Sequence, residues 1–278
     1  MLHKMLKKIF HVLLYLFAAI GLFLVAGYFA VKFGLTNEEG IIDEQRDAFF
    51  EGAASAALAD GPTYTGPWQS SEEWLVVETA LRNDQAALLR AAEDSGVPAR
   101  LIAANLISEQ LRLFFTEREA YKKWFYPLKI LGPQSQFSWG VMGMKEDTAI
   151  QVEAHLKDAS SPYYLGPAYE HRLDFSTNDP KTERFMRMTN QHDHYWSYLY
   201  AGLYLKQIMT QWERSGFPIS NRPDIVSTLY NIGFKYSVPK AEPMVGGAAI
   251  ALSGEIKSFG SLAGEFYNSD LLVDVFPR

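Results

Sequence analysis

The sequence contains no cysteine, so disulfide bonds and thiolate metal sites are both excluded. Basic residues are outnumbered, with 26 Lys and Arg against 32 Asp and Glu, and the net charge is −6. Four of the lysines lie at or before Lys32, so the remainder of the chain is more acidic still. Nucleic-acid binding is not expected of such a domain, because that binding draws most of its affinity from phosphate contacts.

Internal repeats and runs of alternating strand pattern are also missing, so the part after the N-terminal segment is predicted to be all-α and predominantly helical. The 278 residues are 48% hydrophobic, which is ordinary for a globular protein with a filled core. Aromatic residues make up 14% of the chain. They are typical of sugar-stacking surfaces, but large helical cores use the same residues.

The N-terminus predicts a membrane anchor. Residues 9–31 are almost entirely apolar and long enough to span a bilayer. Lys4, Lys7 and Lys8 precede this segment, and Lys32 is the only charge immediately after it. The positive-inside rule therefore places the N-terminal tail in the cytoplasm and the rest outside as a single-pass protein. A cleaved signal peptide is the alternative, but no convincing small-residue cleavage site follows the segment.

The chain divides into three predicted regions. Residues 1–35 form the tail and anchor, residues 36–95 an N-terminal helical region, and residues 96–278 the main domain. Within them we predict helices at 70–94, from about 98 onward, and at 145–157, 182–214, 224–232 and 255–268, with long loops at 159–180 and 239–247.

Glu109 is a single carboxylate within an apolar helical stripe. Ile102, Leu106, Glu109 and Leu113 are spaced to share one face of a helix. Burial of a carboxylate disfavours its anion and raises its pKa, as a general acid near neutral pH requires. The alternative is a glutamate at the edge of a helix contact whose carboxylate reaches solvent or an arginine.

Three short motifs follow in order: Asn105–Gln110 with Glu109, the turn Ser138–Gly143, and Leu229–Gly233 with Tyr230. Together they resemble the lysozyme-like lytic transglycosylases, whose pattern is a catalytic Glu, then Gly-Leu-Met-Gln, then Ala-Tyr-Asn-Ala-Gly. The resemblance covers about half of the chain, from Gly96 to Gly233. It implies a lysozyme-like domain in residues 96–278 of a bacterial inner-membrane protein, facing the periplasm.

The resemblance also implies the chemistry. Glu109 would protonate the glycosidic oxygen between N-acetylmuramic acid and N-acetylglucosamine in peptidoglycan, and then act as base while the muramoyl 6-hydroxyl forms a 1,6-anhydro end. No metal or other cofactor is implied. Tyr230 would place a hydroxyl near the catalytic Glu. The residues implied in substrate binding are Gln110, Ser138, Gly140, Val141, Met142 and Asn231.

Each of these residues also has an ordinary structural interpretation. Tyr230 is equally typical of a core aromatic, and Gly140 and Gly143 of simple turn residues. Gln110 and Gly143 depart from the family, which has Ser after the Glu and Gln at the end of the second motif. These departures favour a catalytically impaired glycan-binding or scaffolding protein as an alternative. A hydrolytic lysozyme-type glycosidase is the other.

A second cluster, His192-Asp193-His194 with Glu170 and His171 upstream, is better read as a solvated polar face than as a metal site. Residues 192 and 194 would point to different faces of a helix, whereas paired ligands usually fall four residues apart. For the run from Pro239 to Gly247 and the following Phe259–Leu262 the sequence gives no mechanism.

Overall fold

The computed structural model of the chain describes residues 67–114, 138–190, 192–252 and 255–278, together with isolated helical residues between Lys7 and Ala26. Most of the predicted anchor at 9–31 lies outside the described residues. Of the helices in the described part, none combines the length and apolar character needed to cross a membrane. The residues from 67 onward that are described belong to one compact unit.

This unit is predominantly helical, which confirms the all-α prediction at the level of fold class. Two short antiparallel hairpins accompany the helices. The helices are α4 (Glu72–Asn83), α5 (Gln85–Ser95), α6 (Ala99–Phe114), α8 (Glu146–Lys157), α9 (Pro180–Met188), α10 (Tyr195–Arg214), α11 (Pro223–Ile232) and α12 (Phe259–Asn268), with short 3₁₀ turns at Trp68–Ser70, Pro167–Tyr169 and Phe234–Tyr236. The strands are β1 (Ser138–Trp139), β2 (Met144–Lys145), β3 (Ala249–Leu252) and β4 (Glu255–Ser258).

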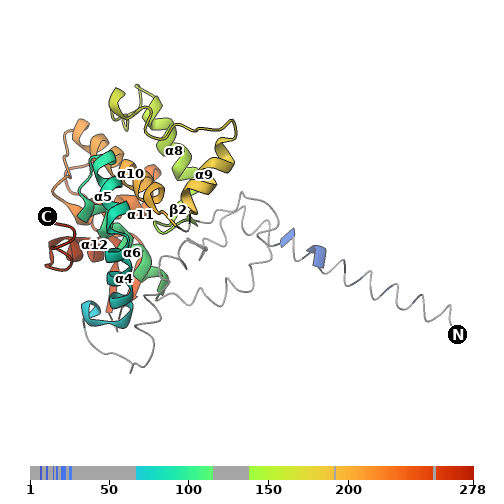
Figure 1. Cartoon of the computed structure of the whole chain (residues 1–278), viewed down its shortest axis with the longest axis horizontal. Coiled ribbons are helices and arrows are strands. Elements are labelled where there is room, and N and C mark those ends of the chain that lie inside the picture. The colour runs from blue at the N-terminus through green and yellow to red at the C-terminus, as the bar shows by residue number, and fades with distance from the viewer. Residues whose placement is uncertain are drawn as a thin grey trace. The chain divides into compact units, whose positions relative to one another are not determined.

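Helix α10 lies against α5, α8, α9 and α11, while α12 packs on α6 and α11 (Figure 1). In Figure 1, α8 and α9 form one end of the unit, and α4, α6 and α12 lie toward the other. The core between them is aromatic-rich, with Trp74, Trp212, Phe259 and Phe266 at most 1% exposed. The aromatic content of the sequence therefore serves the core in large part.

Two predicted long helices are each interrupted. The 70–94 helix is capped by Ser71, whose side chain accepts from the Trp74 N–H, and breaks at Asp84. The 182–214 helix is wrong as one piece, because α9 ends at Met188 and α10 begins at Tyr195. Between them the Asn190 side chain accepts from two backbone N–H groups, at residues 192 and 193, and this local turn competes with helix formation.

The last predicted helix begins four residues too early. Residues 255–258 form β4, which pairs with β3 in the register Ala251↔Ile256, and α12 starts only at Phe259. Along β3 the exposed positions are Ala249 and Ala251, alternating with buried Ile250 and Leu252. Because alanine is apolar, all four residues of β3 are apolar. The strand therefore alternates in burial but not in hydropathy, and the sequence does not show the pattern of a strand.

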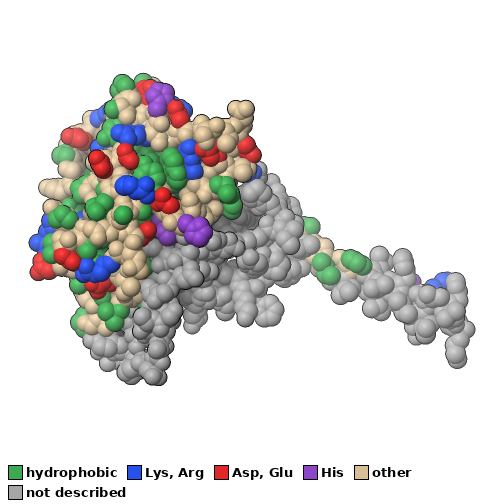
Figure 2. Space-filling view, in the orientation of Figure 1, with side chains coloured by type: hydrophobic (Ala, Val, Ile, Leu, Met, Phe, Trp, Pro, Cys, Tyr) green, Lys and Arg blue, Asp and Glu red, His purple; other side chains and the backbone are tan. Residues whose placement is uncertain are grey.

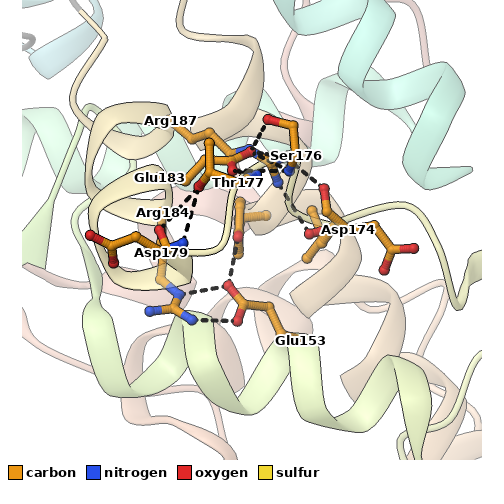
Figure 3. A network of polar contacts seen from close by, with 10 residues as sticks. Glu153, Asp174, Ser176, Thr177, Asp179, Glu183, Arg184 and Arg187 are labelled. Atoms are coloured by element: carbon orange, nitrogen blue, oxygen red, sulfur yellow. Dashed lines mark hydrogen bonds and ion pairs between the residues drawn. The ribbon is translucent and has the colours of Figure 1, made fainter.

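The predicted loop at 159–180 is held to α9 by a polar network (Figure 3). The Glu183 carboxylate accepts from the backbone N–H groups of Ser176 and Thr177 at 2.8–3.0 Å. Arg184 donates to both oxygens of Glu153 on α8, each at 2.7 Å. These contacts join α8, α9 and the loop into one end of the unit.

A buried arginine holds the C-terminal segment. Arg100 on α6 is 0% exposed and donates to the backbone carbonyl oxygens of five residues. These are Phe266, Tyr267, Ser269, Leu271 and Phe276, at 2.6–2.9 Å. Burial lowers the pKa of the guanidinium, and the charge of Arg278 acts in the same direction. Arg100 thereby joins the start of α6 to the end of α12.

Candidate functional site

Helix α6 carries Glu109 into the interior of the unit. Ile102 and Leu106 on the predicted stripe are fully buried, and the Glu109 side chain is only 4% exposed. The side chain of Leu113, the fourth member of the stripe, lies outside the described residues. The stripe is therefore a core-facing face of α6, and the carboxylate lies within it.

The Glu109 carboxylate is paired with Arg112, one turn further along α6. Arg112 Nη2 donates to Glu109 Oε1 at 2.6 Å, and Arg112 Nε donates to Oε2 at 3.3 Å. The Arg112 side chain is itself only 2% exposed. This is the arginine of the alternative interpretation of Glu109, and it makes the site a buried ion pair rather than a lone carboxylate.

The second motif forms a hairpin turn directly against Glu109. β1 and β2 pair through Trp139 and Met144, and Gly140 and Gly143 between them adopt positive φ angles of 67° and 61°. A Cβ atom at Gly143 would lie 2.2 Å from Glu109 Oε1 and 2.5 Å from Cδ. Gly143 is thus a turn residue, as its alternative interpretation has it, and also a position where the backbone comes close to the carboxylate.

The third motif reaches the same turn from helix α11. The Tyr230 hydroxyl donates to the carbonyl oxygen of Met142 at 2.9 Å. Its ring packs on Tyr204 and Phe259 at centroid distances of 5.2 and 6.3 Å, as a core aromatic would. Burial raises the pKa of Tyr230 well above its usual value, and the negative charge of Glu109 adds to this effect. The Tyr230 hydroxyl therefore interacts with the charge of Glu109 and is also hydrogen-bonded to the turn.

The residues predicted to bind substrate are engaged inside the protein. Val141 and Met142 are 0% exposed, and the Val141 carbonyl accepts from the Gln110 side-chain amide. The Asn231 carboxamide oxygen accepts from the Ala248 N–H at 2.7 Å, at the start of β3. The Ser138 side chain lies outside the described residues. Substrate contact by these residues stays a prediction, and in this conformation their polar groups hold the turn and the β3 segment.

Arg112 is the site residue that the sequence analysis did not single out. A basic residue three positions after a glutamate on one helix is a known pairing arrangement, and this spacing was the available signal. The periodicity of apolar residues does not reveal Arg112, because its side chain is charged.

The prediction of a solvated polar face for the histidine cluster is wrong for His194, which is only 6% exposed and pairs with an acidic residue. His194 Nδ1 lies 2.8 Å from Asp84 Oδ2, and the Tyr198 hydroxyl donates to the same oxygen. His171 Nδ1 lies 2.7 Å from Asp174. Over the face shown in Figure 2, acidic and basic side chains of the described part are interspersed rather than gathered into a basic surface.

A groove of about 450 Å³ lies at the start of α11. It is lined by polar side chains that include Asn221, Asp224, Ser261 and Glu265. Glu109, Gly143 and Tyr230 do not line it.

Comparisons of the chain with models of known protein families, with curated proteins and with solved structures find no match. Function is therefore inferred from the contacts around Glu109.

Proposed function

We propose that this chain is a peptidoglycan lytic transglycosylase, anchored in the bacterial inner membrane by residues 9–31, with a lysozyme-like domain in the periplasm. The supporting observation is that the three motifs, far apart in sequence, form one contact group. Gly143 lies against the Glu109 carboxylate, and Tyr230 donates to Met142 from 88 positions further along the chain. In the family that the motifs resemble, these pieces surround the catalytic Glu.

In the proposed reaction Glu109 protonates the glycosidic oxygen, and the bond from that oxygen to C1 of N-acetylmuramic acid breaks. The 6-hydroxyl of the same sugar then bonds to C1 and returns its proton to Glu109. A single carboxylate suffices for these two steps, whereas most glycosidases use two carboxylates at a defined separation. Neither a metal nor another cofactor takes part.

Arg112 favours a second candidate function, a glycan-binding or scaffolding protein of the cell envelope that does not cleave its ligand. Both oxygens of Glu109 accept hydrogen bonds from this guanidinium, so in this conformation both are already bonded to a partner within the protein. Such a protein would bind muropeptide fragments and release them intact.

Mass spectrometry of purified peptidoglycan, incubated with the full chain in detergent, tests both candidates. Glu109→Gln, checked for its helical circular dichroism, is the matched control. Anhydromuropeptides from the wild type alone would establish the transglycosylase. Products with hydrated reducing ends would indicate a lysozyme-type hydrolase. Binding of muropeptides with no cleavage by either protein would favour the scaffold.

A further inference from the structure

The Glu109 carboxylate is closed from two directions. Arg112 donates to both of its oxygens, and the backbone of Gly143 lies against Oε1. The side chains of the pair are 4% and 2% exposed. A glycosidic oxygen has to come within hydrogen-bond distance of a carboxyl oxygen to receive its proton. Among the described residues, Arg112 and Gly143 occupy two of the directions from which a glycosidic oxygen could approach Glu109.

The Glu109–Arg112 pair differs from the Arg184–Glu153 pair, which is also largely buried. Arg184 and Glu153 join α9 to α8, so that pair holds two elements together. Glu109 and Arg112 both belong to α6, three positions apart. The pair itself therefore does not join two elements of the fold.

We infer that Arg112 is a positioning residue that acts as a latch, holding Glu109 in a resting state in which both carboxylate oxygens are bonded to the guanidinium. Cleavage then requires the pair to open, and Arg112 limits the rate at which Glu109 becomes available. This inference deepens the proposed transglycosylase function and rests on it for its catalytic consequence. The inference that Arg112 restricts access to Glu109 can be tested separately, without any measurement of cleavage.

Access to Glu109 is measured without any substrate, by carbodiimide coupling of an amine to carboxyl groups of the full chain. Peptide mass spectrometry then gives the extent of coupling at Glu109 in wild type, Arg112→Gln and Arg112→Lys. The exposed Glu213 is the internal reference. A latch predicts little coupling at Glu109 in the wild type, several-fold more in Arg112→Gln, and an intermediate value in Arg112→Lys. Lysine keeps the charge but has one nitrogen with which to hold the carboxylate.

The same three proteins are then compared in peptidoglycan cleavage. The latch predicts a several-fold higher kcat for Arg112→Gln with little change in KM, since the resting pair no longer has to open. A lower kcat in Arg112→Gln that Arg112→Lys restores would overturn the latch, because Arg112 would then assist cleavage. Equal coupling at Glu109 in all three proteins would overturn it as well.

The two proposals fail in distinguishable ways. Increased coupling in Arg112→Gln without cleavage by any variant supports the latch as a structural device and contradicts the transglycosylase. Wild-type cleavage with unchanged coupling contradicts the latch and leaves the transglycosylase standing. If Arg112→Gln does not fold, as judged by its circular dichroism, the comparison of Arg112→Lys with wild type decides.

Discussion

Gly143 and Glu109 lie so close together that no side chain at position 143 fits without moving the carboxylate. The distance from a Cβ at Gly143 to Glu109 Oε1 would be 2.2 Å, well inside van der Waals contact. The family that the motifs resemble has glutamine at this place. Glycine at position 143 and the Glu109–Arg112 pair therefore depend on each other. The carboxylate, as it lies in the pair, occupies the space that a side chain at position 143 would need.

Gly143→Ala is expected to destabilise the protein more than a matched glycine substitution does. Gly216 also has a positive φ, of 83°, but nothing lies within 4 Å of its Cβ position. Gly216→Ala should cost about 1–2 kcal/mol from backbone strain alone. Gly143→Ala adds a steric conflict with Glu109, worth roughly 1–3 kcal/mol more. Urea unfolding of the two variants gives the difference, and equal losses would contradict the close approach.

A double-mutant cycle is expected to show strong coupling between Glu109 and Arg112. Each single substitution to Gln breaks this buried ion pair, and we expect a loss of about 3–5 kcal/mol in the free energy of unfolding. The double variant should lose less than the sum of the two. The Arg90–Asp193 pair, with side chains 56% and 46% exposed, is the control. Its coupling should stay below about 1 kcal/mol, and similar values for both pairs would contradict the burial of Glu109.

Tyr230→Phe is expected to loosen the Gly140–Gly143 turn. The substitution removes one hydroxyl and leaves the buried Met142 carbonyl without its 2.9 Å donor. Such a loss costs about 1–3 kcal/mol. Tyr236→Phe is the control, since Tyr236 is 60% exposed. Hydrogen exchange of the Gly143 N–H, which donates to Gly140, should become faster only in Tyr230→Phe.

The sequence predicts the helical character of the unit because helices record burial as a periodic pattern. The end of α5 is an example, because the helix predicted to end at residue 94 ends at Ser95, and Gly96 follows with a left-handed φ of 65°. The β3–β4 hairpin is not predicted, since its exposed alanines hide the alternation. The interruption of the 182–214 helix depends on a side-chain turn at Asn190, which helix periodicity does not report.

For the site, the sequence predicts which motifs come together but not the hydrogen-bond partners of their polar groups. Motif order placed Glu109, the Gly140–Gly143 turn and Tyr230 in one group, and they do lie in contact. What each polar group bonds to was not predictable, because it depends on three-dimensional neighbours. Asn231 is bonded to Ala248 of a segment whose role the sequence left open. Arg112 pairs with Glu109 only because α6 turns both residues inward.

Arg100→Met is expected to be among the most destabilising substitutions in the chain. It removes a donor from five buried or partly buried backbone carbonyls at the end of α12 and in the C-terminal segment. Those of Phe266 and Ser269 keep other donors, so three lose the only donor described for them. Buried unsatisfied groups cost about 1–3 kcal/mol each, so a loss of at least roughly 3 kcal/mol is expected. Arg100→Lys should recover only part of it, because lysine donates from one nitrogen. Arg90→Lys, on the surface, should be neutral, and thermal unfolding followed by circular dichroism makes the comparison.

Acid is expected to weaken the attachment of the 159–180 loop to α9 through Glu183. Hydrogen bonds from the backbone N–H groups of Ser176 and Thr177 lower the pKa of Glu183 to about 2 from an ordinary 4.5. Because the pKa in the folded state lies below that in the unfolded state, the stabilisation is fully present above about pH 4.5 and is lost as the pH falls toward 2. Glu183→Gln should therefore be less stable than wild type at pH 6, and the difference should shrink between pH 4.5 and 2.

Urea unfolding at several pH values checks this expectation, with the exposed Glu213→Gln as the control. The hydrogen bonds in Figure 3 that Glu183 accepts favour the carboxylate form, since both of its oxygens accept from N–H donors and neither has to carry a proton. A difference between wild type and Glu183→Gln that is the same at pH 6 and pH 2.5 would show that the contact does not depend on the charge. A difference that disappears in acid would identify Glu183 as a pH-sensitive attachment of this loop.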